Sequence, residues 1–231
     1  MIKSCIKECV MGVHIYFTIM EVMVDMRWKH PFTCLVSGPT GSGKTMWVRE
    51  FLKYKAVMMD IVPEEVIWYY GSWQSVYDEL SETVTFREGL PGSLDELGDD
   101  GKPRLVILDD LMSETDDRIT KLFTKGSHHR NVSVMYIVQN LFGSKKEHRT
   151  ISLNAQYMVV FKNPRDVMQV GTLGRQMQGR RGVSYVQDAF IKATDRPHGY
   201  LLFDLRQDTP ENLRLRSNIF PPSRQDVYVQ Q

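Results

Sequence analysis

The sequence predicts a three-layer α/β fold, in which helices cover both faces of a mostly parallel β-sheet. Two observations carry this prediction. Short apolar runs such as FTCLVSG (32–38) and RLVILDD (104–110) alternate with amphipathic stretches, a pattern typical of strands that are buried on both faces and joined by helices. The first run also leads directly into a glycine-rich loop, as in phosphate-binding α/β folds. The 231 residues are enough for one well-buried core.

The expected elements follow one another in a regular order. We expect strands at residues 32–38, 64–71, 104–110, 131–140, 155–163, 199–205 and 213–220. We expect helices at residues 44–55, 113–126, 164–177 and 183–194. Residues 90–104 are linker-like, because Gly, Pro and Asp cluster there. These elements predict one domain over residues 26–221, preceded by an N-terminal extension (1–25) and followed by a C-terminal tail (222–231).

The N-terminal extension is apolar but lacks the features of an export or membrane segment. Its stretch CVMGVHIYFTIMEVMV (9–24) is interrupted by His14 and Glu21, and no small-residue cleavage site follows it. The three cysteines of the chain are too few for a disulfide framework. We therefore expect a reduced, intracellular protein that is neither secreted nor embedded in a membrane.

The glycine-rich loop matches the P-loop, or Walker A motif, at every fixed position. Its eight residues are Gly38, Pro39, Thr40, Gly41, Ser42, Gly43, Lys44 and Thr45. The glycines let backbone N–H groups turn toward phosphates, Lys44 supplies a positive charge to the β and γ phosphates, and the Thr45 hydroxyl can ligate Mg²⁺. The loop also lies between an expected strand and an expected helix, as this chemistry requires. It predicts ATP and Mg²⁺ as cofactors.

Polar residues at the ends of two later strands complete the expected site. Asp109 and Asp110 follow four apolar residues, as in a Walker B motif, and the carboxyl ends of parallel strands are where such sheets bind ligands. We expect Asp109 to hold Mg²⁺ through water and Asp110 to polarise the attacking water, with Glu114 as the alternative base. Gln139 ends the next strand, where it can sense the γ phosphate or orient water. Asp110 can instead be a helix cap or a turn residue, and Gln139 can instead simply end its strand.

The order of these strands predicts a motor-type P-loop NTPase. In this class an additional strand is inserted beside the P-loop strand. Along the sequence, the strand that carries the acidic pair lies between the P-loop strand and the strand at residues 131–140.

Charge is distributed unevenly, although the formal net charge is only +1. Residues 59–117 contain sixteen Asp and Glu but three Lys and Arg, whereas residues 118–181 contain twelve Lys and Arg but two Asp and Glu. A basic surface can contact nucleic-acid phosphates without regard to sequence. The candidate contacts are Lys121, Lys125, Lys145, Lys146, Arg149, Arg180 and Arg181.

Three stretches carry a resemblance to a known family. They are KLFTKGSHHRNVSVMYIVQNLF (121–142), RTISLNAQYMVVFKNPRD (149–166) and GYLLFDLRQDTPENLRLRSNIFP (199–221). They resemble the DNA-packaging ATPases of Maverick/Polinton and adintovirus elements, which are similar to the poxvirus packaging ATPase and belong to the HerA/FtsK group. The resemblance covers about residues 26–221.

The resemblance implies a homo-oligomeric ring that threads double-stranded DNA into a capsid, in the host nucleus or at a virus assembly site. It also implies that each subunit completes its neighbour's site with an arginine. Arg130 is the best positional match, and Arg149 and Arg175 are the alternatives. The wider group usually has Asp-Glu where this chain has Asp109-Asp110, which leaves the identity of the catalytic base open.

Other functions fit the sequence less well. A nucleotide kinase needs an arginine-rich lid and an acceptor pocket, and a GTPase needs Asn-Lys-x-Asp, whereas FKNPRD (161–166) has the wrong order. A non-motor ATP-binding interaction protein, or an inactive relic of a mobile element, remains the main alternative.

Overall fold

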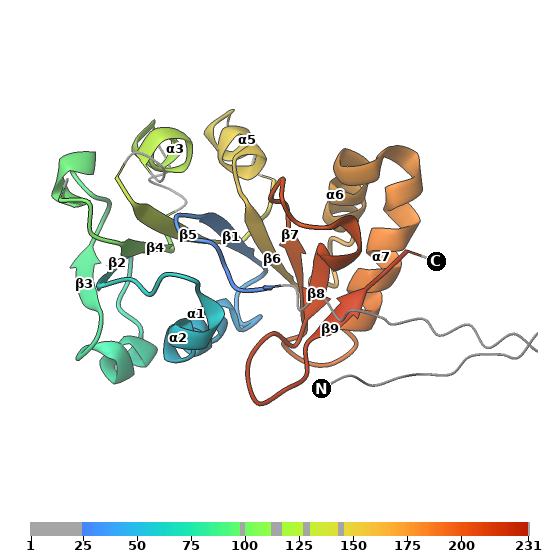
Figure 1. Ribbon diagram of the computed structural model, residues 1–231, viewed down its shortest axis with the longest axis horizontal. Coiled ribbons are helices and arrows are strands. Elements are labelled where there is room, and N and C mark those ends of the chain that lie inside the picture. Colours follow the sequence, from blue (N-terminus) through green and yellow to red (C-terminus); the bar gives the residue numbers. More distant parts are fainter. Residues whose placement is uncertain (1–24, 98–99, 112–116, 127–129, 143–145, 231) are drawn as a thin grey trace, which may run out of the picture.

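A single central sheet organises the protein. The computed structural model describes residues 25–97, 100–111, 117–126, 130–142 and 146–230 (Figure 1). Within these residues, nine strands form one sheet in the order β3-β2-β4-β5-β1-β6-β7-β8-β9. The strands are β1 (Thr33–Ser37), β2 (Glu65–Tyr70), β3 (Thr85–Glu88), β4 (Arg104–Asp109), β5 (Val132–Val138), β6 (Tyr157–Phe161), β7 (Tyr200–Asp204), β8 (Leu215–Ser217) and β9 (Asp226–Tyr228). Strands β1 to β6 are parallel, and β7 to β9 continue the sheet in antiparallel pairs.

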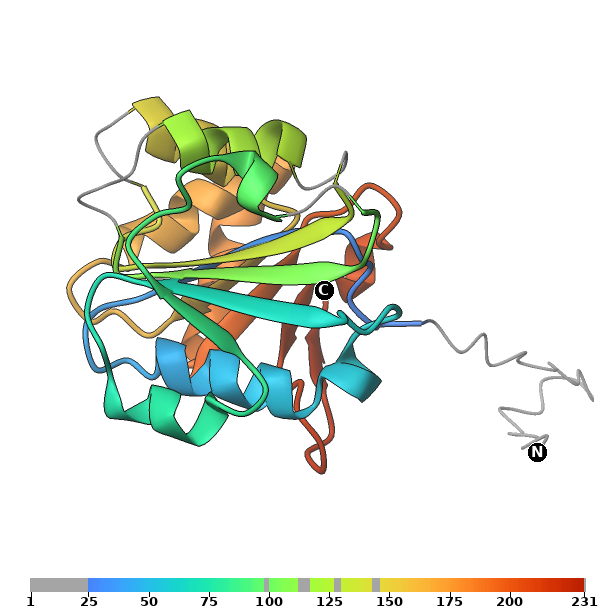
Figure 2. The same ribbon diagram turned by 90° about the vertical axis from the view of Figure 1, so that its left-hand side faces the viewer.

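Helices cover both faces of this sheet (Figures 1 and 2). One layer contains α1 (Lys44–Lys53), α2 (Lys55–Met58) and the 3-10 helix η1 (Ser75–Leu80). The other layer contains α3 (Asp117–Lys121), the π-helical turn η4 (Leu122–Gly126), α5 (Lys146–Leu153), α6 (Met168–Gln178) and α7 (Gly182–Ala193). Shorter 3-10 turns are η2 (Leu94–Leu97), η5 (Gly179–Arg181) and η6 (Glu211–Leu213). The predicted three-layer α/β fold is confirmed.

Alternation along the central strands explains why both faces are apolar. On β1, Cys34 and Val36 pack in the core beneath α1, whereas Leu35 packs in the core beneath α5, α6 and α7. Successive side chains of a strand point to opposite faces, so a strand between two helical layers must be apolar throughout. This requirement is the physical reason that the continuous apolar runs predicted buried strands.

The sheet order places β5 between β1 and β4. The P-loop strand and the strand that ends at Asp109 are therefore not neighbours, which confirms the additional-strand arrangement predicted for a motor-type P-loop NTPase. Because these three strands are parallel, their carboxyl ends lie at one edge of the sheet. The P-loop and Gln139 follow the ends of β1 and β5, and Asp109 is the last residue of β4.

Several elements differ from the sequence expectation. The helix expected at 113–126 is described only from Asp117, and it changes to a π-helical turn after Lys121. Helix α5 was not predicted, because its buried residues include the polar His148 and Ser152 and so give no apolar periodicity. The short strands β3 and β9 were not predicted either. Strand β9 lies within the segment expected to be a C-terminal tail and pairs with β8.

Candidate nucleotide-binding site

The P-loop connects the buried end of β1 to the first turn of α1. Gly41 and Gly43 have φ angles of 76° and 101°, which favour glycine because a β-carbon is strained there. Gly38 has no room for a side chain, since an added Cβ would lie 2.7 Å from Cβ of Phe161 on β6. Glycine at these positions thus permits both the turn and the close packing. The loop ends at the N-terminus of α1, where unpaired backbone N–H groups favour an anion.

Lys44 is held by the loop itself. Its Nζ donates hydrogen bonds to the carbonyl oxygens of Gly38 (2.7 Å) and Pro39 (3.0 Å). Burial lowers the pKa of Lys44, and the charges of Asp109 and Asp110 oppose that shift. The buried Ser42 hydroxyl has no hydrogen-bond partner among the described residues. A phosphate group bound in the loop would satisfy the Ser42 hydroxyl and would offer Lys44 a charged acceptor, so these residues fit a nucleotide.

Asp109 is the most enclosed carboxylate of the site. It ends β4, is only 3% exposed, and accepts three hydrogen bonds on Oδ2. The donors are the Tyr77 hydroxyl (2.8 Å), Gln74 Nε2 (3.4 Å) and the Thr45 hydroxyl (3.5 Å). Burial raises the pKa of Asp109, while the hydrogen bond from Tyr77 lowers it.

The pair of Thr45 and Asp109 fits a magnesium ion. Both present hard oxygen donors, which Mg²⁺ prefers, and Mg²⁺ usually keeps several of its waters. Their oxygens are 3.5 Å apart, so one ion can contact both groups, directly or through a water. A bound cation would also favour the ionised form of Asp109, against the effect of burial.

A pocket of about 240 Å³ brings the predicted residues together. Its lining comprises Thr40, Gly41, Lys44, Thr45, Gln74, Asp109, Asp110, Ile137, Val138 and Gln139. Asp110 is exposed and has a φ of 56°, a left-handed conformation that turns the chain sharply after β4. An added Cβ on Gly71 would lie 2.6 Å from the Asp110 carbonyl oxygen, so this turn packs tightly against the end of β2.

Gln74 and Tyr77 were not predicted as site residues. Both belong to the segment after β2, which is the neighbour of β4 on the side away from β5. The signal was an amide and a tyrosine in GSWQSVY (71–77), directly after the carboxyl end of a predicted strand. That signal becomes informative only once β2 is known to pair with β4.

The arginine candidates lie outside this pocket. Arg130 precedes β5, so it lies at the edge of the sheet opposite to the P-loop. The seven residues of β5 span roughly 20 Å between the two edges, much more than the length of an arginine side chain. Arg149 and Arg175 are exposed on α5 and α6. Glu114, the alternative base, lies outside the described residues.

Several exposed basic residues belong to α3, α5, α6 and η5, which lie in the same helical layer (Figure 1). We call this surface the basic helix face; its described members are Lys121, Lys146, Arg149, Arg175, Arg180 and Arg181. Lys121 is 3.7 Å from Asp117, and so part of its charge is compensated. Lys145 and the side chain of Lys125 are outside the described part of the structure.

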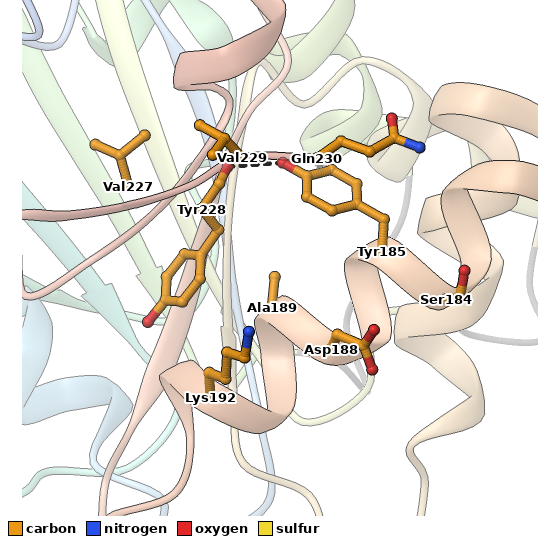
Figure 3. A pocket seen from close by; sticks show the side chains of 9 residues that line it. All are labelled: Ser184, Tyr185, Asp188, Ala189, Lys192, Val227, Tyr228, Val229 and Gln230. Carbon is orange, nitrogen blue, oxygen red and sulfur yellow. Dashed lines mark hydrogen bonds between the residues drawn. The ribbon is translucent and has the colours of Figure 1, made fainter.

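A larger cavity of about 420 Å³ lies elsewhere, between α7 and the segment that contains β9 (Figure 3). The Tyr185 hydroxyl points across it and donates a hydrogen bond to the Tyr228 carbonyl oxygen (2.7 Å). Strands β6, β7 and β8 separate β9 from the P-loop strand. The smaller pocket is therefore the candidate site, because the P-loop and the acidic pair line it. Over the described residues, no helix has the length and apolar character needed to cross a bilayer.

Known proteins that are similar to this chain are found among solved structures. No protein-family model matches the chain, and a search of curated proteins finds no match either. Among solved structures, the genome packaging NTPase B204 from Sulfolobus turreted icosahedral virus 2, in complex with sulfate, is 12% identical with a TM-score of 0.49. That match covers 78% of this chain and 94% of that chain.

Two further solved structures are similar to a comparable degree. The cytoplasmic domain of the Thermomonospora curvata type VII secretion ATPase EccC is 13% identical with a TM-score of 0.49, covering 77% of this chain and 24% of that chain. The cytoplasmic domain of EssC is 19% identical with a TM-score of 0.45, covering 58% of this chain and 32% of that chain. The strand order and the P-loop of the chain itself define a P-loop NTPase fold with the additional strand.

Proposed function

We propose that this protein hydrolyses ATP to drive double-stranded DNA into the capsid of a viral or virus-like element. The observation that carries the ATPase part is the meeting of Lys44, Thr45 and Asp109 around one pocket. These three residues supply a phosphate-binding cation and two magnesium-binding oxygens. The family resemblance of residues 26–221 supports the translocase part.

Each residue of the pocket has a role in this proposal. Lys44 exchanges its contacts with the Gly38 and Pro39 carbonyls for the β and γ phosphates. Bound Mg²⁺ would neutralise phosphate charge, and Thr45 and Asp109 would hold it. Asp110 polarises the attacking water, with Glu114 as the alternative, and general bases of this kind contribute roughly 10²- to 10⁴-fold to the rate.

Gln139 is proposed to orient the attacking water or to sense the γ phosphate. It lines the same pocket as Lys44 and Asp110 and follows β5, the strand between them. A conformational response to the γ phosphate at this point would be transmitted along β5 toward Arg130. Such a link suits a motor, in which hydrolysis in one subunit must be communicated to the next.

The basic helix face is the proposed DNA-binding surface. Its cations come from several helices of one layer, so they can contact successive phosphates without reading the base sequence. The acidic segment (59–117) instead forms the β2, β3 and β4 side of the sheet. This separation of charge would orient the DNA toward one side of each subunit.

An ATPase assay with and without duplex DNA tests the proposed function. We expect Mg²⁺-dependent turnover that DNA stimulates, and we expect the Lys44→Ala variant to lose it. Turnover without DNA stimulation would contradict the translocase, and stimulation by a small phosphate acceptor would favour a kinase. ATP binding with no turnover would favour the alternative of a non-motor interaction protein or an inactive relic.

The salt dependence of DNA binding tests the proposed surface. The test variant replaces three cations of the basic helix face with alanine: Lys146, Arg149 and Arg180. The matched control replaces three basic residues from other surfaces: Lys53, Lys102 and Arg224. Because each lost phosphate contact changes the log-log salt slope by about 0.9, the test variant should flatten the slope by roughly 2 to 3 units. An equal change in the control, or no change in the test variant, would place the DNA on another surface.

A further inference from the structure

The turn that joins α7 to β7 lies directly against the P-loop. His198 Nδ1 is 3.1 Å from the carbonyl oxygen of Ser42. A carbonyl oxygen can only accept, so Nδ1 carries the hydrogen of this bond. An added Cβ on Gly43 would lie 3.2 Å from the same Nδ1, so the imidazole also packs over the last residue of the loop. The pocket described above does not include this histidine.

Backbone hydrogen bonds of the turn hold His198 in place. The Gly199 N–H donates to the Arg196 carbonyl oxygen (3.2 Å), and the Lys162 N–H donates to the Gly199 carbonyl oxygen (3.1 Å). Gly199 has no room for a side chain, since an added Cβ would lie 2.7 Å from the Ala193 carbonyl oxygen. The turn is therefore packed against the end of α7 and anchored to the residue that follows β6.

His198 itself adopts an unfavourable backbone conformation without gaining burial. Its φ is 58°, in the left-handed region that non-glycine residues rarely occupy. Its side chain is exposed, so the hydrophobic effect does not offset this cost. Strained residues held by well-ordered surroundings cluster at ligand sites.

The position of the turn relative to the pocket indicates which part of a nucleotide it would meet. Lys44, Asp109 and Gln139 mark the β- and γ-phosphate end, on the β4 and β5 side of the P-loop. His198 lies on the opposite side, toward β6 and β7, because Tyr200 pairs with Phe161 across those strands. A triphosphate that follows the loop from Asp109 toward the start of α1 has its nucleoside on that side.

We propose that His198 binds the nucleoside of the bound nucleotide, an inference that rests on the proposed ATPase function. With Nδ1 donating to Ser42, the Nε2 of neutral imidazole is an acceptor on the far side of the ring. It can accept a hydrogen bond from a ribose hydroxyl or from the amino group of the base, and the ring face can stack on the base. The same bond to Ser42 couples the nucleoside contact to the shape of the phosphate-binding loop.

In the alternative role, His198 is a strut, that is, a residue that only supports the conformation of the P-loop. Binding of two ligands, one with a nucleoside and one without, distinguishes the two roles. ATP carries the nucleoside, whereas inorganic tripolyphosphate carries the phosphates alone. The dissociation constants of both are measured, in the presence of Mg²⁺, for the full chain and for the variants His198→Ala and Lys44→Ala. Thermal unfolding confirms that each variant is folded.

We expect His198→Ala to weaken ATP binding by about 3- to 10-fold, the effect of one lost hydrogen bond, and to leave tripolyphosphate binding unchanged. We expect Lys44→Ala to weaken both ligands. Equal weakening of both by His198→Ala would show a strut, and no weakening of either would show an uninvolved residue; each result overturns the proposal. If the wild-type chain binds neither ligand, the proposed ATPase function fails and the inference fails with it.

A second variant separates the contribution of the aromatic ring face from that of the ring nitrogens. His198→Phe keeps an aromatic face but removes both the bond to Ser42 and the outer acceptor. ATP affinity close to wild type in this variant would assign the contact to stacking. Affinity as low as that of His198→Ala would assign it to the Nε2 hydrogen bond.

Discussion

The hydrogen bond from Tyr77 to Asp109 gives a sharp test of the magnesium-binding role proposed for Asp109. The phenol lies 2.8 Å from Asp109 Oδ2 and is completely buried. Burial and the nearby Asp109 charge raise the pKa of Tyr77, so its hydroxyl stays protonated and donates. Tyr77→Phe removes this donor but keeps the ring, which stacks on Phe86 with centroids 4.9 Å apart and contacts Trp68 at 5.2 Å.

The expected effect on Asp109 follows from the sign of each contribution. In the proposed function Asp109 would bind Mg²⁺ as a carboxylate, so activity should appear as pH rises through its pKa. Burial raises that pKa and the Tyr77 hydrogen bond lowers it, and therefore loss of the donor should raise the pKa further. The acidic limb of the pH profile should move to higher pH.

The size of the effect follows from the enclosure of the carboxylate. A hydrogen bond to a charged group contributes about 1.5–3 kcal/mol, and Asp109 is only 3% exposed, so solvent compensates poorly for the lost donor. The remaining donors, Gln74 and Thr45, are 3.4 and 3.5 Å from the same oxygen, which is too long for a strong bond. We expect a loss of kcat/KM of about 10-fold or more on the acidic limb, and a smaller loss on the alkaline plateau.

The assay is the pH profile of Mg²⁺-dependent ATP hydrolysis for the wild type and Tyr77→Phe. Tyr69→Phe is the matched control, because Tyr69 is also buried but its hydroxyl accepts a hydrogen bond from Arg87 (3.3 Å) rather than contacting Asp109. An acidic limb that stays in place in Tyr77→Phe, or that moves equally in the control, would refute the reasoning.

Three further predictions concern Asp109, Asp110 and Arg130. Asp109→Asn should abolish Mg²⁺-dependent ATP binding but raise the melting temperature of the nucleotide-free protein at neutral pH. Burial raises the pKa of Asp109, and its charge therefore disfavours folding above that pKa. A lower melting temperature would contradict this. Asp110→Asn should bind ATP but hydrolyse it roughly 10²-fold more slowly or worse; a normal rate there, with a loss in Glu114→Gln, would make Glu114 the base. Arg130→Ala should keep its ATP affinity, whereas its turnover should fall by roughly 10³-fold. Mixing this variant with Lys44→Ala should restore activity at intermediate mixing ratios. Verified mixed assemblies that stay inactive would exclude action of Arg130 between subunits.

The central sheet and the phosphate-binding loop were predictable because their sequence signals are local. A run such as LVIL (105–108) must be buried on both faces wherever it lies, and the glycines of the P-loop report backbone conformations that other residues rarely adopt. The order of the strands was predictable only through the motif, since a P-loop followed by an acidic strand end belongs to few topologies. Composition alone would not have placed β5 beside β1.

The rest of the site depends on pairings that no local signal reveals. Gln74 and Tyr77 reach Asp109 because β2 pairs with β4, and nothing in GSWQSVY (71–77) indicates that pairing. His198 reaches the P-loop because β7 runs antiparallel to β6, whereas the sequence pattern favoured parallel strands. Strand β9 has three residues, of which none is buried, so it lacks the apolar pattern by which strands are recognised.

The position of Arg130 constrains how subunits would assemble if this residue acts on a neighbour's nucleotide. The pocket lies at the carboxyl edge of the parallel strands, and Arg130 lies before β5 at the opposite edge. In a two-fold symmetric dimer, one interface would have to contain both edges of each subunit, about 20 Å apart along β5. A heterologous contact needs only the Arg130 edge of one subunit against the pocket edge of the next. Such contacts close into rings or extend into filaments, and only a closed ring gives every pocket an arginine and a channel through which DNA can pass.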